Sequence, residues 1–202
     1  VIHPAVISVP ERGAGACKEK LISVLYTNCQ SFLNKIDELR IELSDDTRPR
    51  PDVICLTETW THSDIDDSGL QLDGYVLKIR KDRTVEGIAN EDTDFCDFGF
   101  NAATCLKIKT HGSHVRIITV YSSPNTNQEN NEALFKIIRS TDSHAVLVGD
   151  FNFRAIDWSK RVANDKPCRA FLEACDDNFL MQHVDFPTCK QNILDLVLSQ
   201  DP

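Results

Sequence analysis

The sequence predicts a layered α/β sandwich rather than a purely parallel sheet. Short apolar runs alternate with segments of helical periodicity, and two neighbouring strand-like runs near the middle can form a hairpin. The 202 residues, 41 % of them hydrophobic, suit one domain with a substantial core. No apolar run approaches the ~20 residues of a membrane span. The N-terminus lacks the basic start and long apolar stretch of a signal peptide.

The net charge of −9 argues against a domain coated in positive charge for nucleic-acid binding. It does not argue against an enzyme that acts on a phosphodiester through a metal, because such a site itself needs carboxylates. Two compact basic groups are interpreted as solvated faces: Arg80, Lys81 and Arg83, and Arg154, Lys160 and Arg161. Eight cysteines without a C-x-x-C pair or a zinc-type spacing indicate a reducing compartment and no disulfide framework.

The first part of the chain predicts a strand–helix–strand unit behind a flexible tail. Residues 1–19 contain two prolines and two glycines and are interpreted as this tail. A strand over residues 21–26 is followed by Ser31, a candidate N-cap, and by an amphipathic helix over residues 32–44. A second buried strand is expected over residues 53–56.

The middle of the chain predicts three more strands and one helix. Residues 74–80 alternate well enough for a strand, whereas residues 84–100 are acidic and aperiodic and should form a weakly ordered loop. Residues 103–109 and 115–121 are interpreted as adjacent antiparallel strands joined at a His-Gly-Ser turn. Residues 128–139 have the spacing of a helix.

The last part predicts a buried strand, a helix and a final strand. The apolar run at residues 145–148 is too short for a helix, ends at Gly149 and is followed there by Asp150. Pro167 suits the first turn of the next helix. The run at residues 193–198 carries Asp195 in its middle, where a carboxylate should have a partner.

Glu58 and Asp150 are two acids at the ends of two short apolar strands, which suggests a shared metal site. Asn152 follows Asp150 by two positions, so alternation along an extended chain would place both side chains on one side. The simpler alternatives stay open at this point. Glu58 can be a surface loop residue, Asp150 and Asn152 can form a turn, and Tyr121 can be an amphipathic strand-end anchor.

Six stretches carry a resemblance to a known family, in family order. They are N-C-Q-S-F-L-N-K-I-D-E-L at 28–39, D-V-I-C-L-T-E-T-W at 52–60, L-D-G-Y at 72–75, V-Y-S-S-P-N at 120–125, G-D-F-N-F-R-A-I-D-W at 149–158 and P-T-C-K-Q-N-I-L-D-L-V-L at 187–198. Together they resemble the endonuclease domain of non-LTR retrotransposons, within the exonuclease–endonuclease–phosphatase superfamily. The G-D-F-N stretch alone also fits inositol phosphatases and sphingomyelinases.

The resemblance implies that residues 20–202 form a four-layered α/β sandwich, with two mixed β-sheets packed face to face and helices outside. It implies a phosphodiesterase that uses Mg²⁺ or Mn²⁺ to nick DNA at the target site of a retroelement. Asn28 and Glu58 look like its metal-side residues. It further implies a monomer linked to a reverse transcriptase, inside the cell and in the nucleus when active, without a membrane.

The other roles also carry over position by position. Tyr121 is similar to the tyrosine that contacts the scissile phosphate, and Asp150 looks like the residue that orients or deprotonates the attacking water. Asn152 would hold Asp150 and the phosphate. Asp195 occupies the position of the acid that supports the catalytic histidine of the family. We expect these side chains and the metal-side residues to converge on one cleft.

Two features depart from the family pattern. The Ser-Asp-His motif beyond the last strand is absent, since none of the six histidines stands in that context and His183 precedes the final strand. The Gly-Gly-Val strand expected after Asp82-Arg83 is absent as well. We therefore expect a domain truncated at its C-terminus, with weakened nicking. The alternatives are a non-catalytic remnant and a phosphatase or phosphodiesterase acting on a small phosphoester or a lipid.

Overall fold

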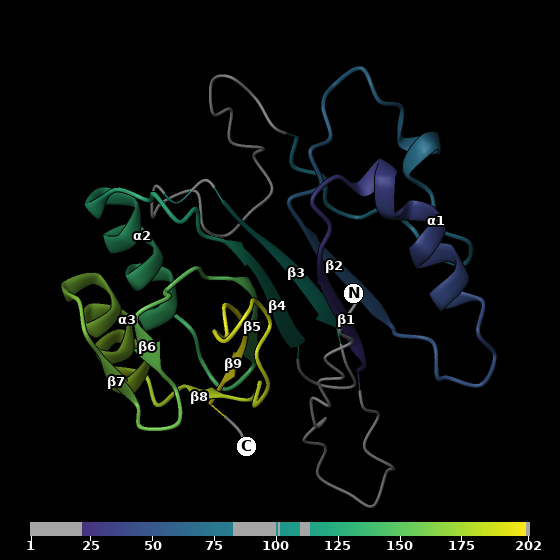
Figure 1. Ribbon diagram of the computed structural model, residues 1–202. Helices are drawn as coiled ribbons and strands as arrows, with labels where there is room; N and C mark the ends of the chain where they lie inside the picture. Colours follow the sequence, from purple (N-terminus) through teal and green to yellow (C-terminus); the bar gives the residue numbers. More distant parts are fainter. Residues whose placement is uncertain (1–21, 83–99, 101, 110–113, 201–202) are drawn as a thin grey trace, which may run out of the picture. The chain divides into compact units, whose positions relative to one another are not determined.

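The computed structural model describes residues 22–82, 100, 102–109 and 114–200 (Figure 1). The chain divides into two compact units. Of the described residues, 22–82 and Lys109 belong to the first unit, and 100, 102–108 and 114–200 belong to the second. The predicted tail at residues 1–19 and residues 84–99 of the predicted acidic loop lie outside the described residues.

The first unit is built on a β–α–β arrangement. β1 (Val24–Asn28) and β2 (Val53–Thr57) pair in parallel, and α1 (Phe32–Leu43) connects them (Figure 1), as parallel strands require a crossover. A short 3₁₀ helix, η1 (Asp67–Leu70), follows. The apolar side chains of α1 recur at helical spacing and pack on the strand and on the segment around η1. They are Phe32, Ile36, Leu39 and Leu43, in contact with Leu25, Leu70 and Leu72.

The start of β1 differs from the prediction of a strand over residues 21–26. Ser23 donates from its amide and its hydroxyl to Asp52 Oδ2, at 2.9 and 2.8 Å, and so leaves the ladder. The regular pairing begins at Val24 and continues to Asn28, which is the last residue of the strand rather than the residue after it.

Ser31 does not cap α1 through its side chain, contrary to the prediction. Its φ of +92° turns the chain into the helix, and its hydroxyl makes no capping hydrogen bond. The orphan amides at the helix start are satisfied by backbone instead. Ser31 N donates to the Glu58 carbonyl and Phe32 N to the Thr59 carbonyl, at 2.9 and 2.8 Å.

The predicted strand over residues 74–80 is wrong, because this segment has no strand structure. Val76 and Leu77 are 73 % and 43 % exposed, so the alternation in the sequence does not correspond to a buried face. The end of the segment is fastened to the preceding loop by Arg80. Its guanidinium donates to Asp67 Oδ1 and Asp82 Oδ1, at 2.6 and 2.7 Å, and to two loop carbonyls.

The second unit contains a mixed five-stranded sheet in the order β3-β4-β5-β9-β8. Its strands are β3 (Ala103–Lys109), β4 (His114–Tyr121), β5 (Ala145–Asp150), β8 (Met181–Gln182) and β9 (Asp195–Ser199). β4 and β5 are parallel, while β9 is antiparallel to both β5 and β8. β3 and β4 are neighbours, as predicted, but β9 begins at Asp195, so this acid opens the strand instead of lying in its middle.

Two helices, α2 (Gln128–Arg139) and α3 (Lys166–Asp177), pack side by side on one face of this sheet (Figure 1). Each has an N-cap that accepts a hydrogen bond from an orphan amide: Asn127 from Asn130 N and Asp165 from Cys168 N. Pro167 lies in the first turn of α3, as predicted. A hairpin of two short strands, β6 (Ile156–Asp157) and β7 (Val162–Ala163), precedes α3.

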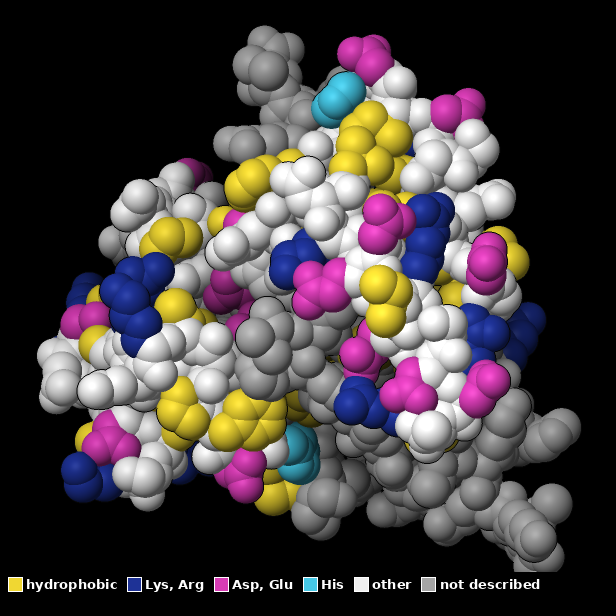
Figure 2. All heavy atoms as spheres, turned by 45° about the vertical axis from the view of Figure 1, so that its right-hand side comes forward, with side chains coloured by type: hydrophobic (Ala, Val, Ile, Leu, Met, Phe, Trp, Pro, Cys, Tyr) yellow, Lys and Arg dark blue, Asp and Glu magenta, His cyan; other side chains and the backbone are white. Residues whose placement is uncertain are grey.

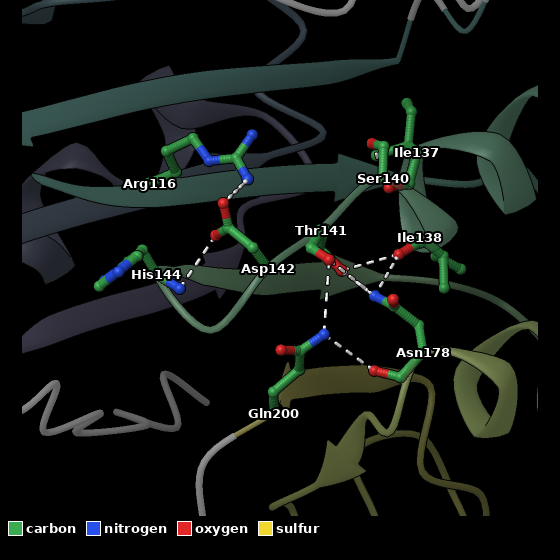
Figure 3. A network of polar contacts seen from close by, with 9 residues as sticks. All are labelled: Arg116, Ile137, Ile138, Ser140, Thr141, Asp142, His144, Asn178 and Gln200. Carbon is green, nitrogen blue, oxygen red and sulfur yellow. Dashed lines mark hydrogen bonds and ion pairs between the residues drawn. The ribbon is translucent and has the colours of Figure 1, made fainter.

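A polar network joins the segments that follow α2, α3 and β9 (Figure 3). Asn178, just after α3, donates from Nδ2 to the Ile138 carbonyl at 2.8 Å and to Thr141 Oγ1 at 2.6 Å. Gln200 Nε2 donates to the Asn178 carbonyl at 3.0 Å, which ties the segment after β9 to the same point. The network therefore satisfies backbone carbonyls that the end of α2 leaves without helical partners.

None of the helices in the described part of the chain has the length and apolar character that a membrane crossing requires. The six cysteines within the described residues are free thiols, as the sequence predicted. Five of them are buried and one, Cys189, is exposed.

Candidate active site

Tyr121, Asp150 and Asp195 form one row across three neighbouring strands of the second unit. In the parallel pair β4–β5, Tyr121 is the register partner of Asp150, and in the antiparallel pair β5–β9, Asp150 is the partner of Asp195. Register partners project to the same face of a sheet. The sheet therefore brings together three of the residues that the resemblance singled out.

The row lies on the face of the sheet opposite α2 and α3. Alternate residues of the three strands pack in the core that contains these helices: Ile118, Val120, Ala145, Leu147, Leu196 and Leu198. Successive side chains of a strand point to opposite faces, so the row residues point away from the helices. Asp150 is only 7 % exposed, which is unusual for a carboxylate and requires polar surroundings.

Gly149 allows β4 and β5 to approach closely beside the row. A Cβ atom at this position would lie 1.9 Å from the Val120 carbonyl oxygen, so only glycine fits. Ser122 N then donates to the Asp150 carbonyl at 2.7 Å, one step beyond the end of β4. The glycine of the G-D-F-N stretch thus sets the spacing that holds Tyr121 next to Asp150.

Asn152 does not continue the alternation that the sequence suggested. β5 ends at Asp150, and Asn152 has a φ of +56°, a left-handed conformation that asparagine tolerates. Its Nδ2 donates to the Ser122 carbonyl at 2.9 Å. Asn152 therefore ties the end of β5 to the end of β4, and its role toward a phosphate stays a prediction.

Thr188 positions Asp195, and the sequence reasoning gave it no role. Its Oγ1 accepts hydrogen bonds from Leu194 N at 2.9 Å and from Asp195 N at 3.0 Å. The Leu194 carbonyl in turn accepts from Phe151 N at 2.9 Å. The signal for Thr188 was present in the P-T-C stretch of the resemblance, but its contacts became visible only with the fold.

In the first unit, Asn28 and Glu58 are in contact. Asn28 Nδ2 donates to Glu58 Oε1 at 2.9 Å, and Asn28 Oδ1 accepts from Gln30 N at 3.3 Å. Both residues lie at the carboxyl ends of the paired strands β1 and β2. The structure thus joins the two predicted metal-side residues, with Asn28 orienting the carboxylate.

The two loops beyond this pair have strained backbones. Gln30, Ser31, Glu58 and Trp60 all have positive φ values, of +47°, +92°, +48° and +52°. Such conformations are costly for residues with side chains and persist only where surrounding contacts impose them. Here the loops are linked by Cys29 N, which donates to the Thr57 carbonyl at 2.9 Å, and by the bonds at the start of α1. Strain of this kind is concentrated at functional sites.

The chemistry of this pair suits a sparse cation site. Mg²⁺ is bound by one or two carboxylates together with waters and substrate phosphates rather than by an all-protein cage. Glu58 is partly exposed, and its Oε2 accepts no hydrogen bond from the described residues. The described part of the chain contains no cluster of three metal-binding side chains. Burial raises the pKa of the neighbouring Cys29 thiol to about 12, so the metal-free thiol stays protonated near neutral pH.

The basic groups predicted to be solvated are largely paired with acids. Arg80 contacts Asp67 and Asp82, and Lys160 contacts Asp157 at 2.9 Å. Arg161 pairs with Asp176. These three side chains therefore stabilise surface turns and do not form a phosphate-binding patch.

A pocket of about 310 Å³ opens beside Asn152 in the second unit. Polar side chains on its wall include Ser122, Ser123, Asn131, Asn152, Arg154 and Asp165. Phe151 and Phe153 form apolar parts of the same pocket. The volume is at the lower end of the range for small-molecule sites.

Residues 115–202 match the family model described as endonuclease–reverse transcriptase. The endonuclease domain of TRAS1, a telomere-specific non-LTR retrotransposon, has a similar structure, with a TM-score of 0.56 and 17 % sequence identity over 88 % of this chain and 84 % of that one. The resemblance to retrotransposon endonucleases is confirmed. The predicted α/β fold class is confirmed as well, because this match extends over most of the chain.

A second solved structure, the 3′ phosphatase NExo from Neisseria bound to a product DNA hairpin, matches with a TM-score of 0.47 and 12 % identity. That match covers 88 % of this chain and 86 % of the phosphatase. No curated protein matches the chain significantly.

Proposed function

We propose that the protein is a metal-dependent endonuclease that hydrolyses a phosphodiester bond of DNA, as part of a retroelement that also encodes a reverse transcriptase. The observation that carries the proposal is the row of Tyr121, Asp150 and Asp195 across β4, β5 and β9. This row combines a nearly buried carboxylate with a phenol and a second acid, in a fold that matches a retrotransposon endonuclease. We further expect the protein to act as a monomer in the nucleus.

Asp150 is suited to orient the attacking water and to accept its proton. A general base must lie within hydrogen-bond reach of that water, and its carboxylate must be held in one orientation. Burial and the strand-end position of Asp150 provide such a fixed carboxylate. Tyr121, the next residue along the row, can donate its phenolic proton to a phosphate oxygen, and Asp195 supports the row from the other side.

Glu58 would hold a divalent cation, Mg²⁺ or Mn²⁺, with Asn28 orienting its carboxylate. A bound cation supplies charge neutralisation at the phosphoryl oxygens. The fit rests on the available Glu58 oxygen and on the partial exposure of the residue. Mg²⁺ needs few protein ligands, so the small number of donors here is compatible with it.

A second candidate function is hydrolysis of a small phosphoester, which the pocket beside Asn152 favours. A plasmid-nicking assay with Mg²⁺, run in parallel with bis(p-nitrophenyl) phosphate and p-nitrophenyl phosphate, separates the two functions. The endonuclease proposal expects nicking that is lost in Glu58→Gln and Asp150→Asn and kept in Glu173→Gln, a change at an exposed acid of α3. Turnover of the small esters without nicking would favour hydrolysis of a small phosphoester, with the monoester reporting a phosphatase and the diester a phosphodiesterase. No turnover of any substrate would favour the non-catalytic remnant.

A further inference from the structure

Trp60 exposes a large aromatic surface next to the predicted metal side of the site. The residue follows Glu58 by two positions and is 49 % exposed. Its indole Nε1 donates no hydrogen bond to any described residue. Other exposed hydrophobic side chains lie in small separate patches on the face seen in Figure 2, and single exposed residues of that kind are ordinary. Among the exposed large hydrophobic residues of the described chain, Trp60 shares its positive φ only with Phe179, and of these two only Trp60 lies two positions from Glu58.

The backbone on both sides of Trp60 is fixed by named contacts. Before it, the Thr59 carbonyl accepts from Phe32 N at 2.8 Å, at the start of α1. After it, Thr61 is 4 % exposed and hydrogen-bonded through its side chain to Asp82. Arg80 donates to the His62 carbonyl at 2.6 Å. The loop that carries Trp60 is therefore pre-organised and does not have to be ordered when a partner binds.

Trp60 itself has a φ of +52°, which is a genuine outlier for a bulky residue. The surrounding contacts impose this conformation, and its effect is to present the indole to solvent instead of burying it. Trp158, the second of the two tryptophans, shows the ordinary alternative. Its ring packs edge-on against Phe171, and its Nε1 donates to the Ile193 carbonyl at 3.3 Å.

We propose that Trp60 is a stacking platform for a nucleobase of the nucleic acid that the enzyme binds, so that the preferred substrate carries an unstacked base. The proposal rests on the proposed function. A nucleobase offers a flat π-face to an exposed indole whatever its sequence, and such stacking changes affinity by about ten- to a hundredfold per base. The chain is acidic, and Arg80, which contacts the same loop, is paired with Asp67 and Asp82. Stacking on Trp60 would therefore supply binding energy that these basic side chains do not supply.

The test uses intrinsic fluorescence in the full chain. In an Asp150→Asn/Trp158→Phe background, which blocks cleavage and leaves Trp60 as the only tryptophan, the protein is titrated with a single-stranded oligonucleotide in Mg²⁺. Stacking quenches the indole emission, with a midpoint equal to that of labelled-DNA anisotropy. Trp60→Ala should weaken binding about ten- to a hundredfold, whereas Trp60→Phe should keep most of it. Circular dichroism confirms that the variants fold.

Unchanged emission during DNA binding, or equal affinities of Trp60→Ala and the parent, would overturn the inference. So would the absence of any binding to single-stranded DNA or to a duplex with a bulged base. Quenching and affinity loss without any nicking by the parent chain would leave the stacking role in place and overturn the endonuclease proposal instead. A Trp60-dependent association with a protein and not with DNA would also contradict the inference.

Discussion

Glu58 directly follows β2 and Asp150 is the last residue of β5, but the two units hold these acids in different ways. Asp150 is fixed by the sheet itself, through strand register, close approach at Gly149 and nearly complete burial. Glu58 stands on a strained loop, is partly exposed, and is fixed by one amide, Asn28. A buried base keeps one orientation, whereas a partly exposed carboxylate can accept a cation with its waters. The difference suits the two roles that we propose for them.

The largest expected effect is the loss of nicking rate when Glu58 or Asp150 is replaced by its amide. Glu58→Gln and Asp150→Asn should each lower the nicking rate by about 10²–10⁴-fold, the usual contribution of a group acting in the transition state. If both act in one chemical step, the double variant should be little slower than the worse single variant. The measurement is a nicking time course at saturating Mg²⁺.

Metal binding separates the two acids in the same set of variants. Manganese binding followed by electron paramagnetic resonance should be weakened by Glu58→Gln and kept in Asp150→Asn. Additive losses in rate, or a loss of manganese binding in Asp150→Asn alone, would contradict the division of roles.

The next effect concerns the sheet that holds Asp150. Gly149→Ala places a methyl group 1.9 Å from the Val120 carbonyl oxygen, so β4 and β5 must separate. Overpacking and backbone strain together should lower the free energy of unfolding by about 3 kcal/mol. Urea denaturation measures the change. Gly69→Ala is the matched control, because its added Cβ meets nothing closer than 4.0 Å and should change little.

A smaller effect is expected at Thr188. Thr188→Val keeps the shape of the side chain and removes the acceptor of Leu194 N and Asp195 N. Two partly buried amides then lose their partner, which should cost about 1–3 kcal/mol of folding free energy. Thr188→Ser retains the hydroxyl and should recover most of the loss. Equal destabilisation by Val and Ser would show that the methyl group, and not the hydrogen bonds, stabilises the start of β9.

The smallest expected effect is a pH dependence of stability that arises from one ion pair in each unit, Arg80–Asp82 and Arg116–Asp142. Burial raises the pKa of Asp82, but hydrogen bonds from Arg80 and Thr61 and the charge of Arg80 outweigh it, so the pKa lies below its ordinary value. Burial also raises the pKa of Asp142. Hydrogen bonds from Arg116 and the His144 amide, together with the charge of Arg116, outweigh this effect, so the pKa of Asp142 lies below its ordinary value. A lowered folded pKa contributes stability above the unfolded value of ~3.9, and this contribution is lost as the pH falls through the folded pKa.

Both pairs retain access to water, so each should contribute less than about 1 kcal/mol. Urea denaturation between pH 6 and pH 3 should therefore show a decline in stability that is shallower in Arg80→Met and in Arg116→Met. An unchanged slope in both variants would mean that other carboxyl groups determine the acid sensitivity.

The sequence predicted the strand and helices around Asp150 better than it predicted residues 74–80. The apolar run before Asp150 is short and buried, and such a run permits few arrangements, so β5 and both flanking helices occur as expected. The alternating residues 74–80 have the same kind of pattern but form no strand, because Arg80 fastens their end to a loop. The periodicity of a short segment carries no information about contacts with residues far away in the sequence.

The missed details at the site have the same origin. The positive φ values of Glu58, Trp60 and Asn152 accompany hydrogen bonds to distant backbone, so the alternation of an extended strand does not describe Asn152. The role of Thr188 depends on the chain folding back onto Asp195. Residue types and the family resemblance named the candidate positions, while the contacts that orient them became visible only with the tertiary structure.

The antiparallel pairing of β5 with β9 also has a consequence for the order of events during synthesis. Asn28 and Glu58 are brought together by one helical crossover, which can form soon after both have left the ribosome. Asp150 waits for a partner that lies near the end of the described chain, and closing that longer loop costs more entropy. A nascent chain would therefore form the pair of Asn28 and Glu58 before the row that contains Asp150. The proposed nicking activity would therefore require β9 to have been synthesised and paired with β5.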